Sequence, residues 1–393
     1  MKRLAWSLIL LLITPPAFSA NKNLSIQDLK GLLISLQQAK KSDAEVATQL
    51  KQIELAEELT ASAMNSLANL VPGPLTTEQM YVLEARSAIL PPPAADLPES
   101  PAPSPAEQSE ILAKASNYLT KAYSQLPHLA ATRMTARFQD GVDAVQTYTG
   151  ATHGLSQNKN PLWDQTNTYT HLINTHTDPV ESENGAEIPP AIKDKTLWGP
   201  NNMVASIGSK LTLETLMHEA TTDGNPKWLR WELLNGARTA VFTFNVDKKK
   251  THLSVIYCCF PNTDTTGLVN YAPGAGANNG TNLQTISEWK PFKANPGYRG
   301  QLFIDPETGI VLRTITTTAF KPTDPVHSET IRTDYAPTPI ASKSPIVPVR
   351  IFTLAEVVPN GDSFAAKYAV RHSFITQNYT NYRPATAAAS APN

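Results

Sequence analysis

Apolar residues recur with two different periods along this chain, and the first period is helical. Up to residue 90 they return every three or four positions, as in Leu29, Leu33 and Leu36. This spacing places them on one face of an amphipathic helix. Ser25 precedes the first such stretch and is a suitable N-cap. We predict three or four short helices within residues 21–90.

Further helix signals and a proline-rich stretch follow. Ser42–Glu45 matches a capping box, and a later helix is predicted to start at Thr76 or Thr77. Seven prolines fall within residues 91–105, which predicts an extended, semi-rigid linker; a proline-rich wrap over the protein surface is the alternative. Ser104–Glu107 then combines an N-cap, a proline and a glutamate, which indicates a strong helix ending near residue 126.

Beyond residue 129 the period changes to two, which is typical of strands. Residues 178–195 are interpreted as a polar loop and Val204–Met217 as an inserted helix. Asp305–Gly309 has the composition of a hairpin turn. The predicted strands are residues 132–138, 168–173, 228–233, 239–246, 252–259, 298–304, 310–320, 329–335, 347–354 and 364–375.

Consecutive strands with short turns favour an antiparallel sheet. The predicted fold class is therefore α+β: short N-terminal helices, a Pro-rich linker, then a helix and a curved, half-barrel-like antiparallel sheet with an inserted helix. The predicted divisions are a signal peptide (1–20), a helical segment (21–90), the linker (91–105), a β-rich domain (106–383) and a disordered tail (384–393).

The N-terminus predicts export. Lys2 and Arg3 precede an apolar run, Leu4–Ile13, and small residues allow cleavage after Ser19 or Ala20. The run is shorter than the roughly 20 residues needed to cross a bilayer. We therefore expect a cleaved chain in the periplasm or outside the cell, without an integral membrane span.

Charge and the search for catalytic or metal motifs narrow the functional classes. The 33 basic and 34 acidic residues nearly balance, which gives no electrostatic basis for binding nucleic acid. His218 and Glu219 are not followed by the second histidine of a zinc-protease motif, and no ligand set has metal-site spacing. We expect no metal, no cofactor, no catalytic residues and no enzymatic activity.

The two cysteines, Cys258 and Cys259, are neighbours in an exported chain. Adjacent side chains on a strand point to opposite faces, so a bond between them would be strained. One buried thiol with the other on the opposite face is the simpler interpretation. A redox switch or an intermolecular bridge is the alternative.

Aromatic residues gather in the predicted sheet and are the candidate ligand-binding residues: Trp228, Trp231, Tyr257 and Phe303. Trp228 and Trp231 are three apart, which places them on opposite faces of a regular strand. Such side chains either line a hydrophobic cavity or fill an ordinary core.

The segment Tyr298–Arg313, with its Asp-Pro-Glu-Thr-Gly turn, resembles a hairpin in uncharacterised exported proteins of soil bacteria. Asp334-Tyr335, Pro348, Ser42–Val46 and Leu197–Pro200 fit the same pattern. The hairpin is also similar to strands of the outer-membrane lipoprotein carrier fold. That resemblance implies a curved sheet around helices, over residues 106–383, which shelters acyl chains. It supplies no catalytic residues.

Two functional hypotheses follow. The leading one is an exported cell-envelope protein that binds a hydrophobic or lipid-like ligand between sheet and helices. The alternative is a non-enzymatic interaction or structural protein whose residues 24–90 dock a protein partner.

Overall fold

A computed structural model describes residues 23–123, 126, 128–142, 168–188, 205–206, 211–261, 289–340, 344–357 and 371–385. The predicted signal peptide and nearly all of the predicted C-terminal tail lie outside these residues. In the described part, no helix combines the length and apolarity needed to cross a membrane.

The N-terminal part, residues 23–96, is called the helical segment below. Its elements are β1 (Asn23–Leu24), α1 (Ile26–Gln38), α2 (Asp43–Leu50), β2 (Glu54–Leu55), α3 (Ala61–Leu67), η1 (Ala68–Leu70), α4 (Pro74–Ser87) and η2 (Ala94–Asp96). The apolar stripes of these helices face one another: Leu29, Leu33, Leu50 and Met80 are buried in one cluster. The stripes therefore form the segment's own core.

Helix starts in this segment are set by side-chain caps. Ser25 is the N-cap of α1 as predicted, and Ser42 forms the predicted capping box at the start of α2. Ser25 also forms a capping box, with Asp28, which was not predicted. The predicted start at Thr76 or Thr77 is wrong, because α4 begins at Pro74, where proline needs no hydrogen-bond acceptor. The cap is supplied from another helix: the Asp43 carboxylate accepts from the backbone N–H groups of Leu75 and Thr76 at 3.0 and 2.9 Å. A cap of this kind leaves no local sequence signal.

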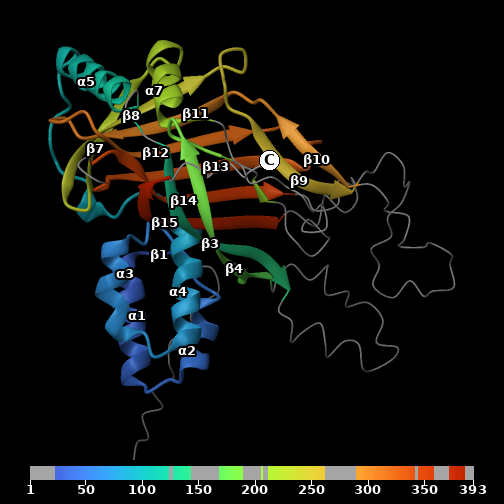
Figure 1. The fold of residues 1–393 in the computed structure, drawn as a ribbon. Coiled ribbons are helices and arrows are strands. Elements are labelled where there is room, and N and C mark those ends of the chain that lie inside the picture. Colours follow the sequence, from blue (N-terminus) through green and yellow to red (C-terminus); the bar gives the residue numbers. More distant parts are fainter. Residues whose placement is uncertain are drawn as a thin grey trace, which may run out of the picture.

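The centre of the molecule is an antiparallel sheet of ten strands. They are β3 (Leu129–Val142), β4 (Thr168–Glu183), β5 (Ala186–Glu187), β7 (Lys227–Leu234), β8 (Ala237–Val246), β11 (Tyr298–Ile304), β12 (Val311–Ala319), β13 (Val326–Pro337), β14 (Ile346–Val357) and β15 (Arg371–Pro384). Their order is β5-β4-β3-β15-β14-β13-β12-β11-β8-β7. The sheet is curved and open (Figure 1), so the predicted α+β class with a half-barrel-like sheet is confirmed.

The two faces of this sheet are covered differently, and each is named after a helix. On the α4 face, α4 packs against β15 and β4. On the α5 face lie α5 (Pro105–Tyr123) and α7 (Leu213–Thr222), which pack on β11 and β8 (Figure 1). A small sheet of β6 (Ala205–Ser206), β9 (Val255–Pro261) and β10 (Trp289–Ala294) joins them, and Tyr257 of β9 lies in the main core.

Several predicted boundaries are wrong for identifiable reasons. The polar stretch from residue 178 continues β4 to Glu183 and turns into β5 at Asn184-Gly185, both with positive φ. An Asn-Gly pair is a strong hairpin signal that outweighs the polarity of its neighbours. The inserted helix runs from Leu213 to Thr222 rather than from Val204, because Thr212 caps it.

Candidate functional site

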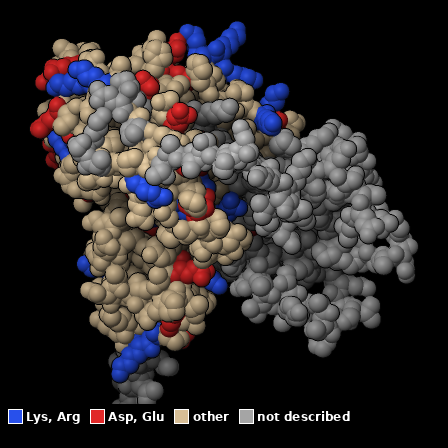
Figure 2. Space-filling model, in the orientation of Figure 1, with Lys and Arg blue, Asp and Glu red and all other residues tan. Residues whose placement is uncertain are grey.

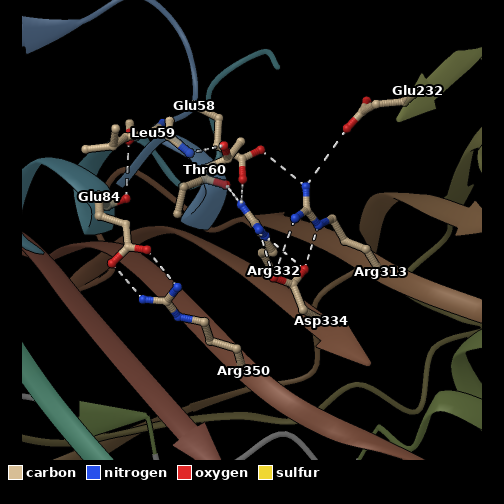
Figure 3. Close-up of polar contacts among 12 residues, drawn as sticks. Glu58, Leu59, Thr60, Glu84, Glu232, Arg313, Arg332, Asp334 and Arg350 are labelled. Atoms are coloured by element: carbon tan, nitrogen blue, oxygen red, sulfur yellow. Dashed lines mark hydrogen bonds and ion pairs between the residues drawn. The ribbon is translucent and has the colours of Figure 1, made fainter. Parts of the chain in front are cut away.

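Buried ion pairs join the helical segment to the α4 face of the sheet. Glu58, 5% exposed, accepts from Arg332 Nη1 at 2.5 Å and from Arg313 Nη1 at 3.2 Å (Figure 3). Arg332 Nη1 also donates to the carbonyl of Ala88 at 2.8 Å. Side chains of β12 and β13 thus hold the end of α4 and the loop before α3.

Asp334 neutralises the same two arginines from within the sheet. Its Oδ1 lies 2.6 Å from Arg313 Nε, and its Oδ2 lies 2.7 Å from Arg332 Nη2. Burial on its own would raise the pKa of Asp334, but the charges of Arg332 and Arg313 hold that pKa at about 2. The carboxylate therefore stays ionised across the physiological pH range.

Glu232 and Arg230 on β7 complete what we call the arginine cluster: Glu58, Arg230, Glu232, Arg313, Arg332 and Asp334. Burial raises the pKa of Glu232, and the nearby arginines oppose this. Three carboxylates face three guanidinium groups, so the cluster has no net charge. A neutral, paired network of this kind fixes orientation well but offers no spare base for catalysis.

A second ion pair and an apolar patch extend the same interface. Both oxygens of Glu84 on α4 accept from Arg350 on β14, each at 2.7 Å (Figure 3). Arg350 also stacks over Phe352, 4.4 Å from the ring centroid. Beside them, Val82 of α4 packs with Phe138 in an apolar cluster. The helical segment is therefore fixed on the α4 face in one register.

The predicted aromatic candidates do not converge on one cavity. Trp228 and Trp231 were expected on opposite faces, which is wrong: their ring centroids are 4.8 Å apart. A bulge between Trp228 and Arg230 shifts the register, so the tryptophans pair with Phe242 and Ala240 and both lie on the α5 face. Trp231, 7% exposed, belongs to the core there.

The other two candidates lie on different faces. Tyr257 is 1% exposed on the α5 face, and its hydroxyl donates to Glu329 Oε1 at 2.5 Å. Burial and the neighbouring carboxylate both raise the pKa of Tyr257. Phe303 pairs in register with Arg313, which places it on the α4 face beneath the arginine cluster. Three of the four candidates thus share the α5 face, as packed core residues.

Trp231 also contacts the linker. Its indole N–H donates to the carbonyl of Pro101 at 2.8 Å, and η2 packs on β7. The proline-rich stretch therefore passes over the β7 edge, from the α4 face to α5 on the other side. An edge strand covered in this way cannot easily pair with another chain.

Two hollows lie on the helical segment, away from the aromatic candidates. One, of about 100 Å³, is lined by residues that include Leu33, Val46 and Leu70. This is smaller than the usual range of about 300–1,000 Å³ for ligand pockets. The other is a shallow surface hollow over α2, lined by Ala44, Glu45, Thr48 and Gln49. Neither resembles a lipid cavity.

An exposed apolar stripe on residues 24–90 is the feature that favours the alternative hypothesis, a docked protein partner. The large apolar side chains exposed there are Leu75 and Tyr81, both on α4, while the apolar stripes of the helices are buried inside the helical segment.

The cysteine side chains lie outside the described residues. Among the described residues, no group of three or more His, Cys, Asp or Glu side chains is placed to hold a metal ion. In the view of Figure 2, acidic and basic side chains are both scattered over the described surface.

Comparisons with known proteins assign this chain to no family. No family model matches it, and no curated protein sequence does. A solved structure of an outer membrane lipoprotein-sorting protein domain from Vibrio parahaemolyticus is similar, at 11% identity and a TM-score of 0.23, over 72% of this chain and 95% of that one. The MucA/MucB complex structure from Pseudomonas aeruginosa is similar at 8% identity and a TM-score of 0.19, over 70% of this chain and 99% of the matched one. TM-scores this low carry no argument about function.

Proposed function

We propose that the protein is a non-enzymatic binding protein of the cell envelope that holds a hydrophobic ligand on the α5 face of its sheet. The predicted export signal supports the location. The observation that carries the proposal is the unequal cover of the sheet. The α4 face is occupied by the chain's own helical segment, tied down by Glu58–Arg332 and Glu84–Arg350.

The α5 face extends past the strands on which α5 and α7 pack. Helices α5 and α7 pack on β11 and β8, over the half of the sheet that ends at β7. On the other half, isoleucines and threonines such as Ile331, Ile351 and Thr353 share this face by register. Methyl groups of this kind suit an apolar ligand, and binding sites commonly lie between a sheet and its covering elements.

Native mass spectrometry of protein purified from an envelope fraction tests the proposal. We expect a non-covalent adduct that is lost after organic extraction, and we expect the extracted protein to bind oleyl alcohol. Two isoleucines on neighbouring strands provide a matched pair. Ile331 lies on the α5 face, whereas Ile315 pairs with Arg332 on the α4 face, and both are half-buried.

The substitution Ile331→Asn should weaken binding of oleyl alcohol at least about threefold, because it removes apolar contact area. Ile315→Asn should leave the binding unchanged. Absence of both an adduct and oleyl alcohol binding would refute the proposed function. Equal effects of the two substitutions would show that the ligand does not lie on the α5 face.

A further inference from the structure

Exposed cations gather where β8 ends and β11 begins. They come from β7, the turn after β8, β10 and β11, and together we call them the basic corner: Lys227, Lys248, Lys249, Lys293 and Arg299. Between the described residues, none of these cations forms an ion pair, whereas the neighbouring Lys250 binds Asp223 at 2.5 Å. The charges of the basic corner therefore face the solvent.

Strand register places two of these cations on the same face of the sheet. Arg299 lies opposite Asn245 on β8. Lys227 lies opposite Thr243, two positions earlier on that strand, and residues two apart share a face. This is the α4 face, because the intervening Phe244 belongs to the core beneath α5 and α7. With β8 between them, the two cations leave the sheet about 12 Å apart.

Two turns bring the lysines beside them. In the turn after β8, the backbone N–H of Lys250 donates to the carbonyl of Asp247 at 2.9 Å. The turn before β11 packs so closely against it that a Cβ on Gly297 would lie 2.8 Å from the backbone nitrogen of Lys248. Lys293 lies near the end of β10, which leads into this second turn. In Figure 2, basic side chains crowd the turn at the top of the molecule, above β8.

The basic corner is strongly positive although the chain as a whole is not. Asp247 is an exposed carboxylate in the same turn and offsets one of the cations. The complete chain has a formal net charge of -1. Positive charge is thus concentrated at one end of β8 and β11, where it attracts an anionic surface.

An exposed apolar side chain beside the basic corner narrows the kind of surface. Leu229 is 40% exposed and is the extra residue at the bulge between Trp228 and Arg230, two positions from Lys227. Cations next to an exposed leucine suit the interfacial region of a bilayer, which accepts both. The cations are too widely spaced to surround a single phosphate, but they match an array of laterally mobile headgroups.

We propose that the basic corner docks this protein on the anionic headgroups of a phospholipid bilayer. The inference goes beyond the proposed function, because it concerns the surface that the protein approaches rather than the ligand that it holds. Each lysine or arginine near an anionic bilayer strengthens binding about fivefold. The helical segment lies at the opposite end of the molecule, away from the bilayer (Figure 1).

Co-sedimentation of the full chain with lipid vesicles tests this docking. Vesicles of phosphatidylcholine have no net charge, and vesicles that also contain phosphatidylglycerol are anionic. At low ionic strength we expect binding to the anionic vesicles alone, and we expect added sodium chloride to weaken it. Equal binding to both kinds of vesicle, or to neither, would overturn the inference and leave the proposed function standing.

The double variant Lys248→Gln with Lys249→Gln should weaken binding to anionic vesicles at least about tenfold. Both lysines lie in an exposed turn, so the variant should fold normally. Its control is Lys30→Gln with Lys40→Gln, which removes the same charge from exposed positions of the helical segment. The control should weaken binding less than about twofold. An equal loss in the two variants would show that net charge drives binding, and would overturn the inference.

Leu229→Gln tests whether the anionic surface is a bilayer. It should weaken binding to anionic vesicles about threefold, because an inserted leucine loses its apolar contact. Its affinity for dissolved polyglutamate should equal that of the wild type, since that polymer offers charge without an apolar interior. Polyglutamate that binds the wild type more tightly than anionic vesicles do, at the same concentration of charge, would overturn the assignment to a bilayer.

Discussion

Glu84 and Arg350 lie 266 positions apart in the sequence, yet their side chains form two hydrogen bonds of 2.7 Å each. This pair joins α4 of the helical segment to β14 of the sheet. Both side chains are largely removed from water. Its role can be measured separately from that of the apolar contacts around it.

Replacing Glu84 by alanine should lower the free energy of unfolding by about 3 kcal/mol, because Arg350 would remain buried without its counter-ion. Urea unfolding measures this. The double variant Glu84→Met with Arg350→Met should recover much of the loss, since an apolar pair leaves no uncompensated charge. Lys41→Ala breaks the exposed Lys41–Glu45 pair and should change little. A double variant as unstable as the single one would contradict a charge-burial origin.

The contact between Trp231 and the linker should control access to the chain at Glu99. The variant Trp231→Phe keeps an aromatic side chain but removes the indole N–H that donates to the Pro101 carbonyl. Loss of this hydrogen bond should lower the local stability of the linker by about 1 kcal/mol. We therefore expect a glutamate-specific protease to cleave at Glu99 roughly fivefold faster. Mass spectrometry of the fragments measures the cleavage rate. Trp228→Phe is the control and should cleave at the normal rate. Unchanged cleavage in Trp231→Phe would show that the linker is held by other contacts.

Two glycines should respond to alanine in opposite directions. Gly309 closes the turn after β11 with φ +76, and an added Cβ would lie 2.7 Å from the carbonyl carbon of Lys114 on α5. Gly309→Ala should destabilise the protein by about 2 kcal/mol or more. Gly31 lies exposed within α1 with no atom near an added Cβ, so Gly31→Ala should stabilise by about 1 kcal/mol. Thermal unfolding of both variants checks the pair.

Stability should depend on pH through His372 on β15. Its Nδ1 lies 2.8 Å from Asp140 Oδ2, and this hydrogen bond raises the pKa of His372 above its usual 6.5, against the effects of burial and of Arg86. The protonated imidazole is therefore favoured in the folded state. Its stabilising contribution is complete below the unfolded pKa and is lost as the pH rises through the folded one.

The measurement compares unfolding free energies of the wild type and His372→Gln over a range of pH. We expect the difference to be largest near about pH 5.5 and to shrink toward about pH 8.5. The variant Asp140→Asn should remove most of this dependence, because Asp140 is the main cause of the shift. A difference that grows with pH would contradict the assignment.

Local patterns predicted the parts of the fold that depend on neighbouring residues. The N-cap at Ser25, the capping box at Ser42 and the Asp305–Gly309 turn are each set within a few positions, and all three form as expected. The bulge after Trp228 has no such signature, because it depends on how β7 pairs with β8. It reversed the expected placement of the two tryptophans.

The arginine cluster was not predicted for a related reason. Glu58 and Arg332 meet across 274 positions, and isolated charged residues in a sequence usually lie at the surface. The sequence did suggest a ligand face with aromatic residues, but three of the four, Trp228, Trp231 and Tyr257, pack in the core with α5 and α7.

The place of β15 has a consequence for the order of folding. This last strand, Arg371–Pro384, lies between β3 and β14, and so joins the two halves of the sheet. During synthesis the N-terminus emerges first, so the helical segment can form early. The sheet stays in two pieces until the chain has been synthesised as far as residue 384. Completion by so distant a contact is slow. Until then the unpaired edges of β3 and β14 remain open to other chains, and this is the stage at which the protein most needs protection from aggregation.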